Sequence, residues 1–246
     1  MNLLFVLAMT FGDLQGITNP TFIVEVSGTM RPSSGEEMAR YEVIRVGQMM
    51  LQGGYVTGTW GNVSCRFGDK MLISPSGMDY GTLTVDDICA VGLRNGECAS
   101  KRKPSIETPL HRAVYNERPD VNWVIHNHSR LAGTVAAARK TIPPILDDMV
   151  QLVGGPVRVA EYGLPGSDDL VENCLTALGQ FNAVLLANHG VVCVGKDSVN
   201  TFRTCEVVEK AALAFLLGQL IGGPVPIPDE LVDAMHDFFM NRYGQR

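Results

Sequence analysis

Two short apolar runs around a tight turn constrain the fold of this chain more than any other stretch. Residues 182–195 read NAVLLANHGVVCVG, in which each run has the length and the β-branched content of a strand. Asn188, His189 and Gly190 form the turn, and we expect Gly190 to take a positive φ that lets the strand reverse. Strand-like and helix-like segments alternate along the chain in a mixed order. We therefore predict an α/β fold, a single three-layer α/β/α domain with a central mixed, largely antiparallel β-sheet.

The other elements are predicted from periodicity and from start and stop signals. Residues 35–52 follow serines, carry two early glutamates and end at Gly53 and Gly54, as a capped helix does. Glycine-punctuated β-type runs cover residues 57–77, with FGDK at the tip of a hairpin. We also expect a capped turn and a strand at 84–93, a hairpin turn at 94–97, a mixed proline- and glycine-rich segment at 141–167, and helices at 105–118, 130–139, 168–180, 198–223 and 229–246.

Charge and composition limit the classes of partner. The chain has 246 residues with a formal net charge of −6, and its longest basic run is residues 101–103. We expect no nucleic-acid partner, because such a surface needs clustered positive charge. No long uninterrupted apolar stretch occurs, so we expect no membrane-spanning helix. The six cysteines form no CxxC pair, which indicates reduced thiols in a cytoplasmic protein.

The first 33 residues stand apart from the rest of the chain. They begin with MNLLFVLAMTFGD, an apolar run that suggests a secretion signal, but no lysine or arginine precedes it and no A-x-A-like cleavage site follows. We expect residues 1–33 to be an N-terminal extension of unknown role, for example one that starts at an upstream start codon. Residues 34–246 are then the folded domain.

A strand that ends in two histidines is the first sign of a metal site. Residues 121–129 read VNWVIHNHS, so His126 and His128 are two positions apart and point to the same side of a strand. Their Cα atoms are then about 7 Å apart, which allows one ion to bridge the two rings. The alternative is a pair of polar residues at the edge of the sheet, since histidines occur there for other reasons too.

Two further residues complete a candidate metal site. His189 lies in the tight turn of LLANHGVV, and Glu107 lies at the head of a helix, where the helix dipole favours its charge. Three imidazoles and one carboxylate suit Zn²⁺, which is usually four-coordinate, although other divalent ions use the same donors. His111 follows Glu107 by four residues and shares a helix face with it, so both support of Glu107 and simple packing stay open.

Small-residue turns elsewhere in the chain indicate a phosphate site. Such turns offer backbone N–H groups and short hydroxyl or amide donors, which bind anions when they line a concave surface. Each turn alone has an ordinary explanation, because glycine and serine are common in turns for steric reasons. The candidate donors are Thr59, Gly61 and Asn62 in TWGNVS, Ser76 and Gly77 in SPSG, and Ser105 in KPSIE.

The order of these segments resembles that of the class II aldolase and adducin family over roughly residues 36–246. This family includes L-fuculose-1-phosphate aldolase, to which the resemblance is closest, L-ribulose-5-phosphate 4-epimerase and the adducin head domain. Several separate motifs in one order are far more specific than any one of them. The resemblance rests on TWGNVSCR, MLISPSGMDYGTL, KPSIETPLH, RPDVNWVIHNHS, LLANHGVVCVG and EVVEKAA.

The resemblance implies a role for each candidate residue. His126, His128 and His189 would be the zinc ligands, and Glu107 would be the fourth ligand in the resting enzyme and the acid/base during turnover. Tyr243, in a Tyr-Gly context near the C-terminus, would handle the hydroxyl proton. The residues that would bind the substrate phosphate are Gly61, Asn62, Ser76, Gly77 and Ser105.

Two departures from the family pattern concern the substrate. Ile106 stands where a second serine often precedes the glutamate, which removes one phosphate donor. Asp147 and Asp148 stand near the position of a tyrosine that serves the fuculose enzyme. These acids put the identity of the aldehyde half in doubt and leave the metal and phosphate halves intact.

The resemblance implies a zinc-dependent aldolase that cleaves a 1-phosphoketose such as L-fuculose 1-phosphate to dihydroxyacetone phosphate and a small aldehyde. An epimerase of the L-ribulose-5-phosphate 4-epimerase type is the alternative, with Asp147 or Asp148 and Tyr243 as its pair of acids. A scaffold module like the adducin head is a third reading, which the presence of all three histidines disfavours. The family also implies a homotetramer with sites at subunit interfaces, so that Tyr243 would serve a neighbour's site.

Overall fold

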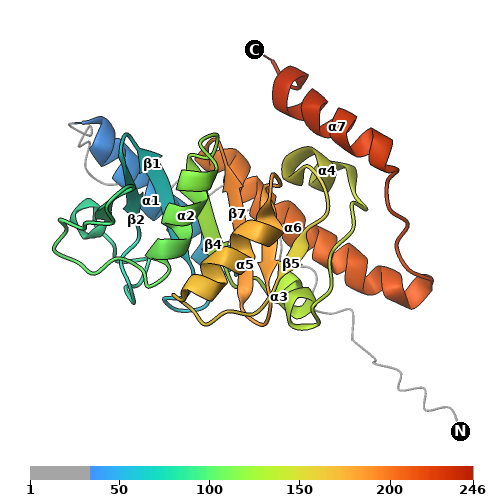
Figure 1. The fold of residues 1–246 in the computed structure, drawn as a ribbon, viewed down its shortest axis with the longest axis horizontal. Coiled ribbons are helices and arrows are strands. Elements are labelled where there is room, and N and C mark those ends of the chain that lie inside the picture. The colour runs from blue at the N-terminus through green and yellow to red at the C-terminus, as the bar shows by residue number, and fades with distance from the viewer. Residues whose placement is uncertain (1–33, 246) are drawn as a thin grey trace, which may run out of the picture. The chain divides into compact units, whose positions relative to one another are not determined.

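The computed structural model describes residues 34–245, and their strands form one sheet of seven (Figure 1). In chain order the strands are β1 (Asn62–Phe67), β2 (Lys70–Ile73), β3 (Cys89–Gly92), β4 (Trp123–Asn127), β5 (Arg158–Ala160), β6 (Ala183–Leu186) and β7 (Gly190–Gly195). The α-helices are α1 (Gly35–Gln52), α2 (Thr108–Glu117), α3 (Arg130–Ala137), α4 (Asp147–Val153), α5 (Asp168–Leu178), α6 (Ser198–Gly218) and α7 (Asp229–Arg242), and two short 3-10 turns are η1 (Val85–Asp87) and η2 (Gln219–Ile221).

The sheet is mixed and largely antiparallel, as predicted. Its strand order is β3-β2-β1-β4-β7-β6-β5, and only β5 and β6 are paired in parallel. Strand β4 is the central strand, between β1 and β7. Within β4, His126 is opposite Asn62 of β1 on one side and opposite Val192 of β7 on the other. One metal-ligand candidate therefore lies at the centre of the sheet.

Helices cover both faces of the sheet, which makes the three layers that the sequence predicts. Alternate residues of the strands point to opposite faces, so Ile125 and Val124 belong to different cores. Ile125 packs in the core under α1, α3, α4 and α6, and Val124 packs in the core under α2 and α5. Helix α7 packs on α4, where the His236 ring N–H donates to the Gln151 carbonyl oxygen at 2.8 Å.

The predicted helix over residues 35–52 is confirmed at both ends. The Ser34 hydroxyl accepts a hydrogen bond from the backbone N–H of Glu37, which caps the N-terminus of α1. Gly54 beyond the other end has a φ of 71°, which glycine adopts at little cost. Helix α7 is shorter than expected, because it ends at Arg242 and leaves Tyr243 in an extended conformation.

Two local predictions differ from the structure. The turn at 94–97 is followed by a single bridge between Val91 and Cys98, so the expected second strand of that hairpin does not form. The mixed segment 141–167 contains a short helix, α4, and a short strand, β5, neither of which was assigned from the sequence. Both elements are held by tertiary packing of short sequences, which periodicity detects poorly.

The turn between β6 and β7 corrects the expectation for Gly190. The residue with positive φ is Asn188, at 56°, and Gly190 already belongs to β7. Glycine is required at position 190 for a different reason. A Cβ atom there would lie 2.4 Å from the carbonyl oxygen of Asn127, so only a residue without a side chain allows β7 to approach β4 this closely.

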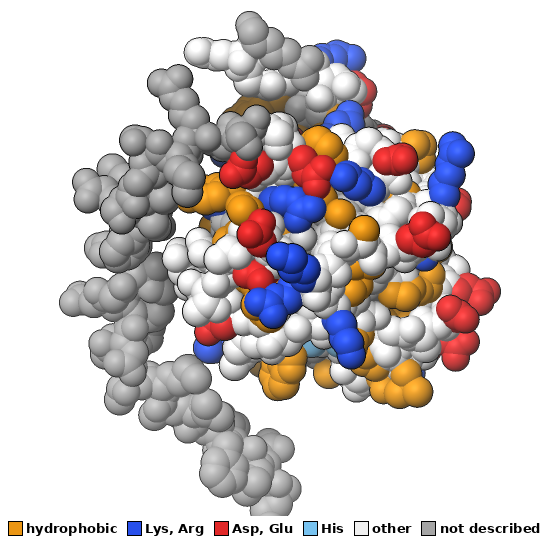
Figure 2. All heavy atoms as spheres, turned by 90° about the vertical axis from the view of Figure 1, so that its left-hand side faces the viewer, with side chains coloured by type: hydrophobic (Ala, Val, Ile, Leu, Met, Phe, Trp, Pro, Cys, Tyr) orange, Lys and Arg blue, Asp and Glu red, His pale blue; other side chains and the backbone are white. Residues whose placement is uncertain are grey.

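Other predictions from composition concern the surface and the thiols. Every cysteine is free, and all but Cys98 are buried. In the described part of the chain no helix is long and apolar enough to cross a membrane. Figure 2, seen from the side of α1 and β2, shows basic and acidic side chains interspersed on that face. Among the ion pairs of the described residues, Glu36 pairs with both Arg40 and Lys70. The prediction for residues 1–33 lies outside the described residues.

Candidate metal and phosphate site

Three histidines converge where the central strands of the sheet end. His126 is in β4, His128 follows it directly, and His189 lies in the turn between β6 and β7. The ligand nitrogens of the three rings all lie within 4.8 Å of one another. His126 Nε2 and His128 Nε2 are 2.9 Å apart. The structure therefore brings together the two histidines of HxH and the histidine of the distant turn.

Glu107 joins this cluster from the other side. It is the residue that precedes helix α2, and its side chain makes no capping hydrogen bond but turns toward the histidines. Its Oε2 atom lies 3.2 Å from His126 Nε2, and its Oε1 atom lies 3.3 Å from His189 Nε2. Glu107 is only 4% exposed, and Oε1 has no hydrogen-bond donor among the described residues. The carboxylate is thus part of the cluster that the sequence predicted.

Two glycines make this convergence sterically possible. At Gly190, as described above, a side chain would collide with the end of β4. Gly61 has a φ of 75°, and a Cβ atom there would lie 2.8 Å from the carbonyl oxygen of His126. Both glycines therefore let neighbouring backbone pack tightly around the strand that carries His126. The hydroxyl of Tyr80 also donates to the Gly61 carbonyl oxygen at 2.8 Å, which fixes that loop.

The environment keeps His128 and His189 neutral and Glu107 ionised at neutral pH. Burial, reinforced by the neighbouring imidazoles, lowers the pKa of His128 to about 3 and that of His189 to about 4. Burial alone would raise the pKa of Glu107, but His126, the hydrogen bond from Asn62 and His189 together hold this pKa below its ordinary value. Neutral imidazoles and a carboxylate are the protonation states that bind metal ions.

The donor set fits a divalent cation. His126 Nδ1 donates to the carbonyl oxygen of Val191 at 3.0 Å, so Nε2 is the ring atom turned toward the cluster. There it lies 3.2 Å from Glu107 Oε2, so that one cation could bind both the imidazole and the carboxylate. Three nitrogen donors and one carboxylate are a typical set for Zn²⁺. The residues present therefore fit a divalent ion such as zinc.

A chain of buried polar side chains leads away from Glu107. Asn62 Nδ2 donates to Glu107 Oε2 at 2.8 Å, and Asn62 Oδ1 lies 2.6 Å from His111 Nε2. His111 Nδ1 lies 2.6 Å from the Ser64 hydroxyl, which lies 2.8 Å from the Tyr115 hydroxyl. The sequence left open whether His111 supports Glu107 or only packs. The structure connects it to Glu107 through Asn62.

The predicted phosphate turns and the metal cluster line the same cavity. Its volume is about 370 Å³, enough for a small phosphorylated metabolite. The lining includes every predicted phosphate donor together with three of the four candidate metal ligands. These residues are Thr59, Gly61, Asn62, Ser76, Gly77, Ser105, Glu107, His128 and His189.

Some of the backbone donors in these turns already have partners. The backbone N–H of Ser76 donates to the carbonyl oxygen of Lys103 at 2.9 Å, so Ser76 can offer an anion its hydroxyl. The Ser105 hydroxyl accepts from the backbone N–H of Glu107 at 3.2 Å and keeps its own proton for another partner. The described lining of the cavity contains no lysine or arginine. An anion bound there would therefore depend on neutral donors and on a metal ion.

Two apolar residues at this cavity were not recognised as site residues from the sequence. Trp60 is 63% exposed and stacks on the His128 ring with 6.1 Å between ring centroids. Ile106 is also 63% exposed and lines the same cavity. Their exposure depends on how distant loops meet, so no local pattern identifies them. The only available signal was their position beside predicted donors.

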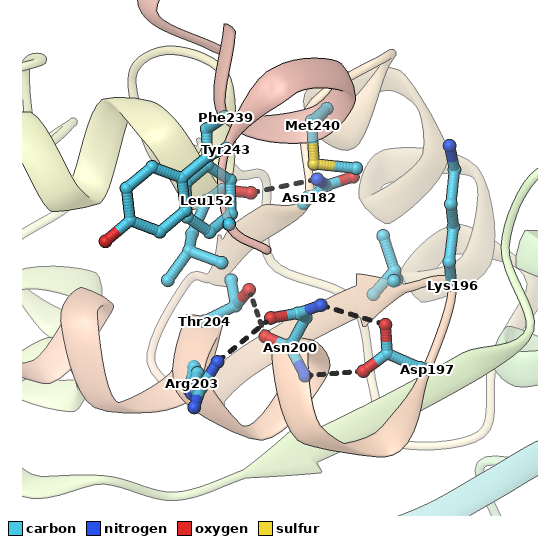
Figure 3. A pocket seen from close by; sticks show the side chains of 13 residues that line it. Leu152, Asn182, Lys196, Asp197, Asn200, Arg203, Thr204, Phe239, Met240 and Tyr243 are labelled. Carbon is cyan, nitrogen blue, oxygen red and sulfur yellow. Dashed lines mark hydrogen bonds between the residues drawn. The ribbon is translucent and has the colours of Figure 1, made fainter. Parts of the chain in front are cut away.

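The described chain does not bring Tyr243 to the histidines. Tyr243 lines a different cavity, of about 400 Å³, together with Leu152, Asn182, Arg203 and other residues (Figure 3). Its ring stacks on Phe239 with 5.3 Å between centroids and is 61% exposed. The linings of the two cavities share no residue. A role for Tyr243 at the histidines of its own chain is therefore not supported by this arrangement.

Asp147 and Asp148 have a structural explanation. They occupy the first turn of α4, where acidic side chains interact favourably with the helix dipole. Asp148 also forms an ion pair with Lys210 at 2.7 Å. Neither aspartate lines the cavity of the histidines. The helix start and the ion pair of Asp148 thus account for these acids without a catalytic role.

Comparison with known proteins agrees with this geometry. Residues 41–216 match the family described as class II aldolase and adducin N-terminal domain. The chain belongs to this class II aldolase family. The predicted family is confirmed, and so is the predicted fold class.

The relatives of this class II aldolase carry several names. A solved structure of L-fuculose 1-phosphate aldolase is 32% identical with a TM-score of 0.80, and the match covers 84% of this chain and 100% of that one. The 5-deoxy-D-ribulose 1-phosphate aldolase of Bacillus thuringiensis serovar kurstaki is 30% identical over 84% of this chain and 97% of its own length. The 3-oxo-tetronate 4-phosphate decarboxylase of Pectobacterium atrosepticum is 33% identical over 78% and 90%. All three names specify a phosphorylated sugar or sugar acid.

Proposed function

We propose that this chain is a metal-dependent aldolase that cleaves a 1-phosphoketose, such as L-fuculose 1-phosphate, to dihydroxyacetone phosphate and a small aldehyde. One observation carries the proposal: the cluster of His126, His128, His189 and Glu107 opens on the cavity that the small-residue phosphate turns line. A metal beside an anion site suits a substrate whose ketone is close to a phosphate. Membership of the class II aldolase family supports the same reaction class.

The three histidines and Glu107 would hold the metal ion. A bound divalent ion would act as a Lewis acid that withdraws electrons from the substrate ketone. The other tasks fall to side chains of this protein. They must bind the phosphate, orient the carbon chain and move two protons.

The phosphate would be held by neutral donors. Hydroxyl groups and backbone N–H groups line the cavity and are suited to bind the phosphate oxygens. They belong to Thr59, Ser76 and Ser105 and to Gly61 and Gly77, respectively. Because the structure describes no lysine or arginine in the lining, these donors would fix the position of the phosphate more than they neutralise it. Ile106 contributes no polar group at the place where a second serine would add a donor.

Cleavage of the C3–C4 bond of the ketose requires two proton movements. The hydroxyl on C4 loses its proton as the aldehyde forms, and C3 gains a proton as dihydroxyacetone phosphate forms. We assign the second transfer to Glu107, whose Oε1 atom lacks a hydrogen-bond donor; once Oε1 has taken up a proton from solvent, it would deliver that proton to C3 and become a carboxylate again. In the direction of condensation the same oxygen would remove that proton.

We assign the first transfer to Tyr243, in the site of a neighbouring subunit. Its hydroxyl is exposed at the end of α7 and lines a separate cavity of its own chain, which leaves it available to another copy. A homotetramer with sites at subunit interfaces satisfies this requirement. Free thiols and a phosphorylated substrate fit a cytoplasmic enzyme.

The epimerase reading has less support than the aldolase reading. It needs an acid on each side of the substrate, and Asp148 is engaged with Lys210 outside the cavity. A scaffold role would not require a convergent set of buried metal ligands.

A substrate panel tests the proposal. Enzyme loaded with Zn²⁺ is incubated with L-fuculose 1-phosphate, 5-deoxyribulose 1-phosphate, ribulose 5-phosphate and 3-oxo-tetronate 4-phosphate, and the products are identified. Release of dihydroxyacetone phosphate from either 1-phosphoketose supports the aldolase. Interconversion of ribulose and xylulose 5-phosphates indicates the epimerase, and carbon dioxide release from the sugar acid indicates a decarboxylase. Protein that binds no divalent ion would contradict all three enzyme readings.

The role of Glu107 has its own test. We expect Glu107→Gln to lower kcat for cleavage by about 10²- to 10⁴-fold, the usual contribution of a positioned acid or base. Glutamine keeps the size of the side chain but cannot carry the proton. The measurement is dihydroxyacetone phosphate release by protein with known metal content. A variant that retains zinc and nearly full activity would show that Glu107 has no such role.

A further inference from the structure

The chain of polar side chains behind Glu107 is longer than packing requires. It contains Asn62 and Ser64 of β1 and His111 and Tyr115 of α2, joined by contacts of 2.8, 2.6, 2.6 and 2.8 Å counted outward from Glu107. All four side chains are buried. Apolar residues of similar size would fill this space without any polar group to satisfy.

The donors in this chain can be assigned one after another. An ionised carboxylate only accepts hydrogen bonds, so the Asn62 Nδ2 group donates to Glu107 and the Asn62 Oδ1 atom faces His111. Because Oδ1 only accepts, the proton of His111 is on Nε2. His111 is fully buried, and burial lowers its pKa to about 3, so the ring is neutral and Nδ1 accepts from the Ser64 hydroxyl. The Tyr115 hydroxyl then donates to Ser64.

Every donor in the chain therefore points toward Glu107. Hydrogen bonds that run in one direction polarise each other and strengthen the last bond. That last bond anchors Oε2 and leaves Oε1 without a donor, 3.3 Å from His189 Nε2. The two oxygens of one carboxylate are thereby made unequal.

We infer that Asn62, His111, Ser64 and Tyr115 are positioning residues that hold Oε2 of Glu107 in place and present Oε1 to the metal and the substrate. The role of Oε1 toward the substrate rests on the proposed function. Its role toward the metal does not, because it concerns the protein without substrate. Asn62 also lines the cavity, and its amide has a second proton that can reach a bound phosphate. It thus connects the predicted phosphate site to the carboxylate.

The test uses variants at increasing distance from Glu107. They are His111→Leu, His111→Gln, Ser64→Ala and Tyr115→Phe, with Val114→Ala as the matched control. Val114 lies in α2 next to Tyr115, and its side chain is apolar and fully buried, so its truncation affects only packing. Three quantities are measured on the full-length protein: the thermal midpoint, the Kd for Co²⁺ with the visible spectrum of the Co²⁺ protein, and kcat and KM of the metal-loaded enzyme.

We expect His111→Leu to weaken Co²⁺ binding or lower kcat by about 10- to 100-fold, the usual effect of losing a group that orients a metal ligand. Its Co²⁺ spectrum should change, because the carboxylate ligand is no longer fixed. His111→Gln can still donate to Asn62 and should recover part of the loss. Ser64→Ala and Tyr115→Phe should give progressively smaller effects on kcat, with KM changed less than kcat.

A structural role predicts a different pattern. The inference is wrong if His111→Leu and Ser64→Ala lower the thermal midpoint as Val114→Ala does but keep the Kd, the spectrum and kcat of the unsubstituted protein. If the unsubstituted protein cleaves none of the sugar phosphates, the proposed function fails. The Co²⁺ measurements need no substrate, so they still decide whether the hydrogen-bonded side chains Asn62, His111, Ser64 and Tyr115 position Glu107.

Discussion

The two cavities of this protein differ in how completely a single chain builds them. The cavity at the end of β4 is bounded by central strands, and its key groups Glu107 and Asn62 are buried and hydrogen-bonded to each other. The cavity near Tyr243 is lined by the end of β7, the first turns of α6, the end of α7 and Leu152 of α4 (Figure 3). The tyrosine itself is largely exposed. The residues proposed to bind the metal and the phosphate thus come together within one chain, whereas Tyr243, the proposed second proton carrier, lies away from them.

This difference separates the side chains that the fold of one subunit positions from those that a neighbouring subunit would have to supply. Groups that bind the metal and the phosphate need accurate positions, which central strands with neighbours on both sides provide. A group on the last turn of a terminal helix has few such restraints, and its position is decided by what it meets. The following experiments test this separation, starting with the largest expected effect.

Removal of one imidazole should abolish metal binding at the proposed site. We expect His189→Ala to lose tightly bound metal and to lower kcat by at least about 10³-fold, because Lewis-acid activation contributes several kcal/mol and each 1.36 kcal/mol is tenfold. Metal content and dihydroxyacetone phosphate release are measured together. His236→Gln is the control, since His236 binds only the Gln151 carbonyl oxygen. Full zinc occupancy in His189→Ala would contradict the assignment of this ligand.

Loss of the tyrosine hydroxyl should leave the metal part intact. We expect Tyr243→Phe to keep its metal content and to lower kcat by about 10²-fold. Mixed oligomers of Tyr243→Phe and Glu107→Gln subunits should regain activity, because some sites then combine an intact Glu107 with an intact Tyr243. Tyr41→Phe, another exposed tyrosine, is the control. Unchanged kcat in Tyr243→Phe would leave the tail without a catalytic role.

The buried His111 should make stability depend on pH. Burial lowers its pKa in the folded state to about 3, whereas an unfolded chain takes up a proton near pH 6.5. Its contribution to stability is therefore full above about pH 6.5 and is lost as the pH falls toward 3, by up to about 1.4 kcal/mol per pH unit. Urea unfolding of metal-free protein at pH 7 and pH 4.5 measures this change. The difference between the two values should shrink in His111→Gln, and an unchanged difference would show that His111 is not responsible.

The smallest effect is expected outside both cavities. Asp148→Asn removes an ion pair with Lys210 in which both side chains are substantially exposed, 40% and 58%. Such pairs contribute at most about 1 kcal/mol, so stability should change little and kcat should stay within about 2-fold. A loss of activity comparable to that of Tyr243→Phe would revive the epimerase reading, in which an aspartate near this position acts as an acid.

The sequence was most informative where chemistry and chain position coincide. The spacing of His126 and His128, the glycine turn at His189 and the helix start at Glu107 are local signals, and the structure brings these residues together. The ends of α1 could likewise be predicted, because Ser34 caps the helix through Glu37, three residues away, and Gly53–Gly54 directly follow its last residue. Such signals need no knowledge of distant contacts.

The remaining features depend on contacts between distant segments. Gly190 was correctly identified as necessary, but its reason is the carbonyl oxygen of Asn127 on another strand and not its own φ. The contact of Trp60 with His128 and the contact of Asn62 with His111 each join different segments of the chain. Short elements such as α4 and β5 were missed for the same reason, since packing and not periodicity defines them.

The central position of β4 also determines how the site responds to metal loss. Strand β4 has three strands on each side, so its backbone amides should be among the slowest in the protein to exchange with deuterium. His126 is then attached to the part of the chain that opens last, so the position of this proposed ligand would not depend on a bound ion. In a cell short of the required metal, such a protein would remain folded and could bind the ion again without refolding.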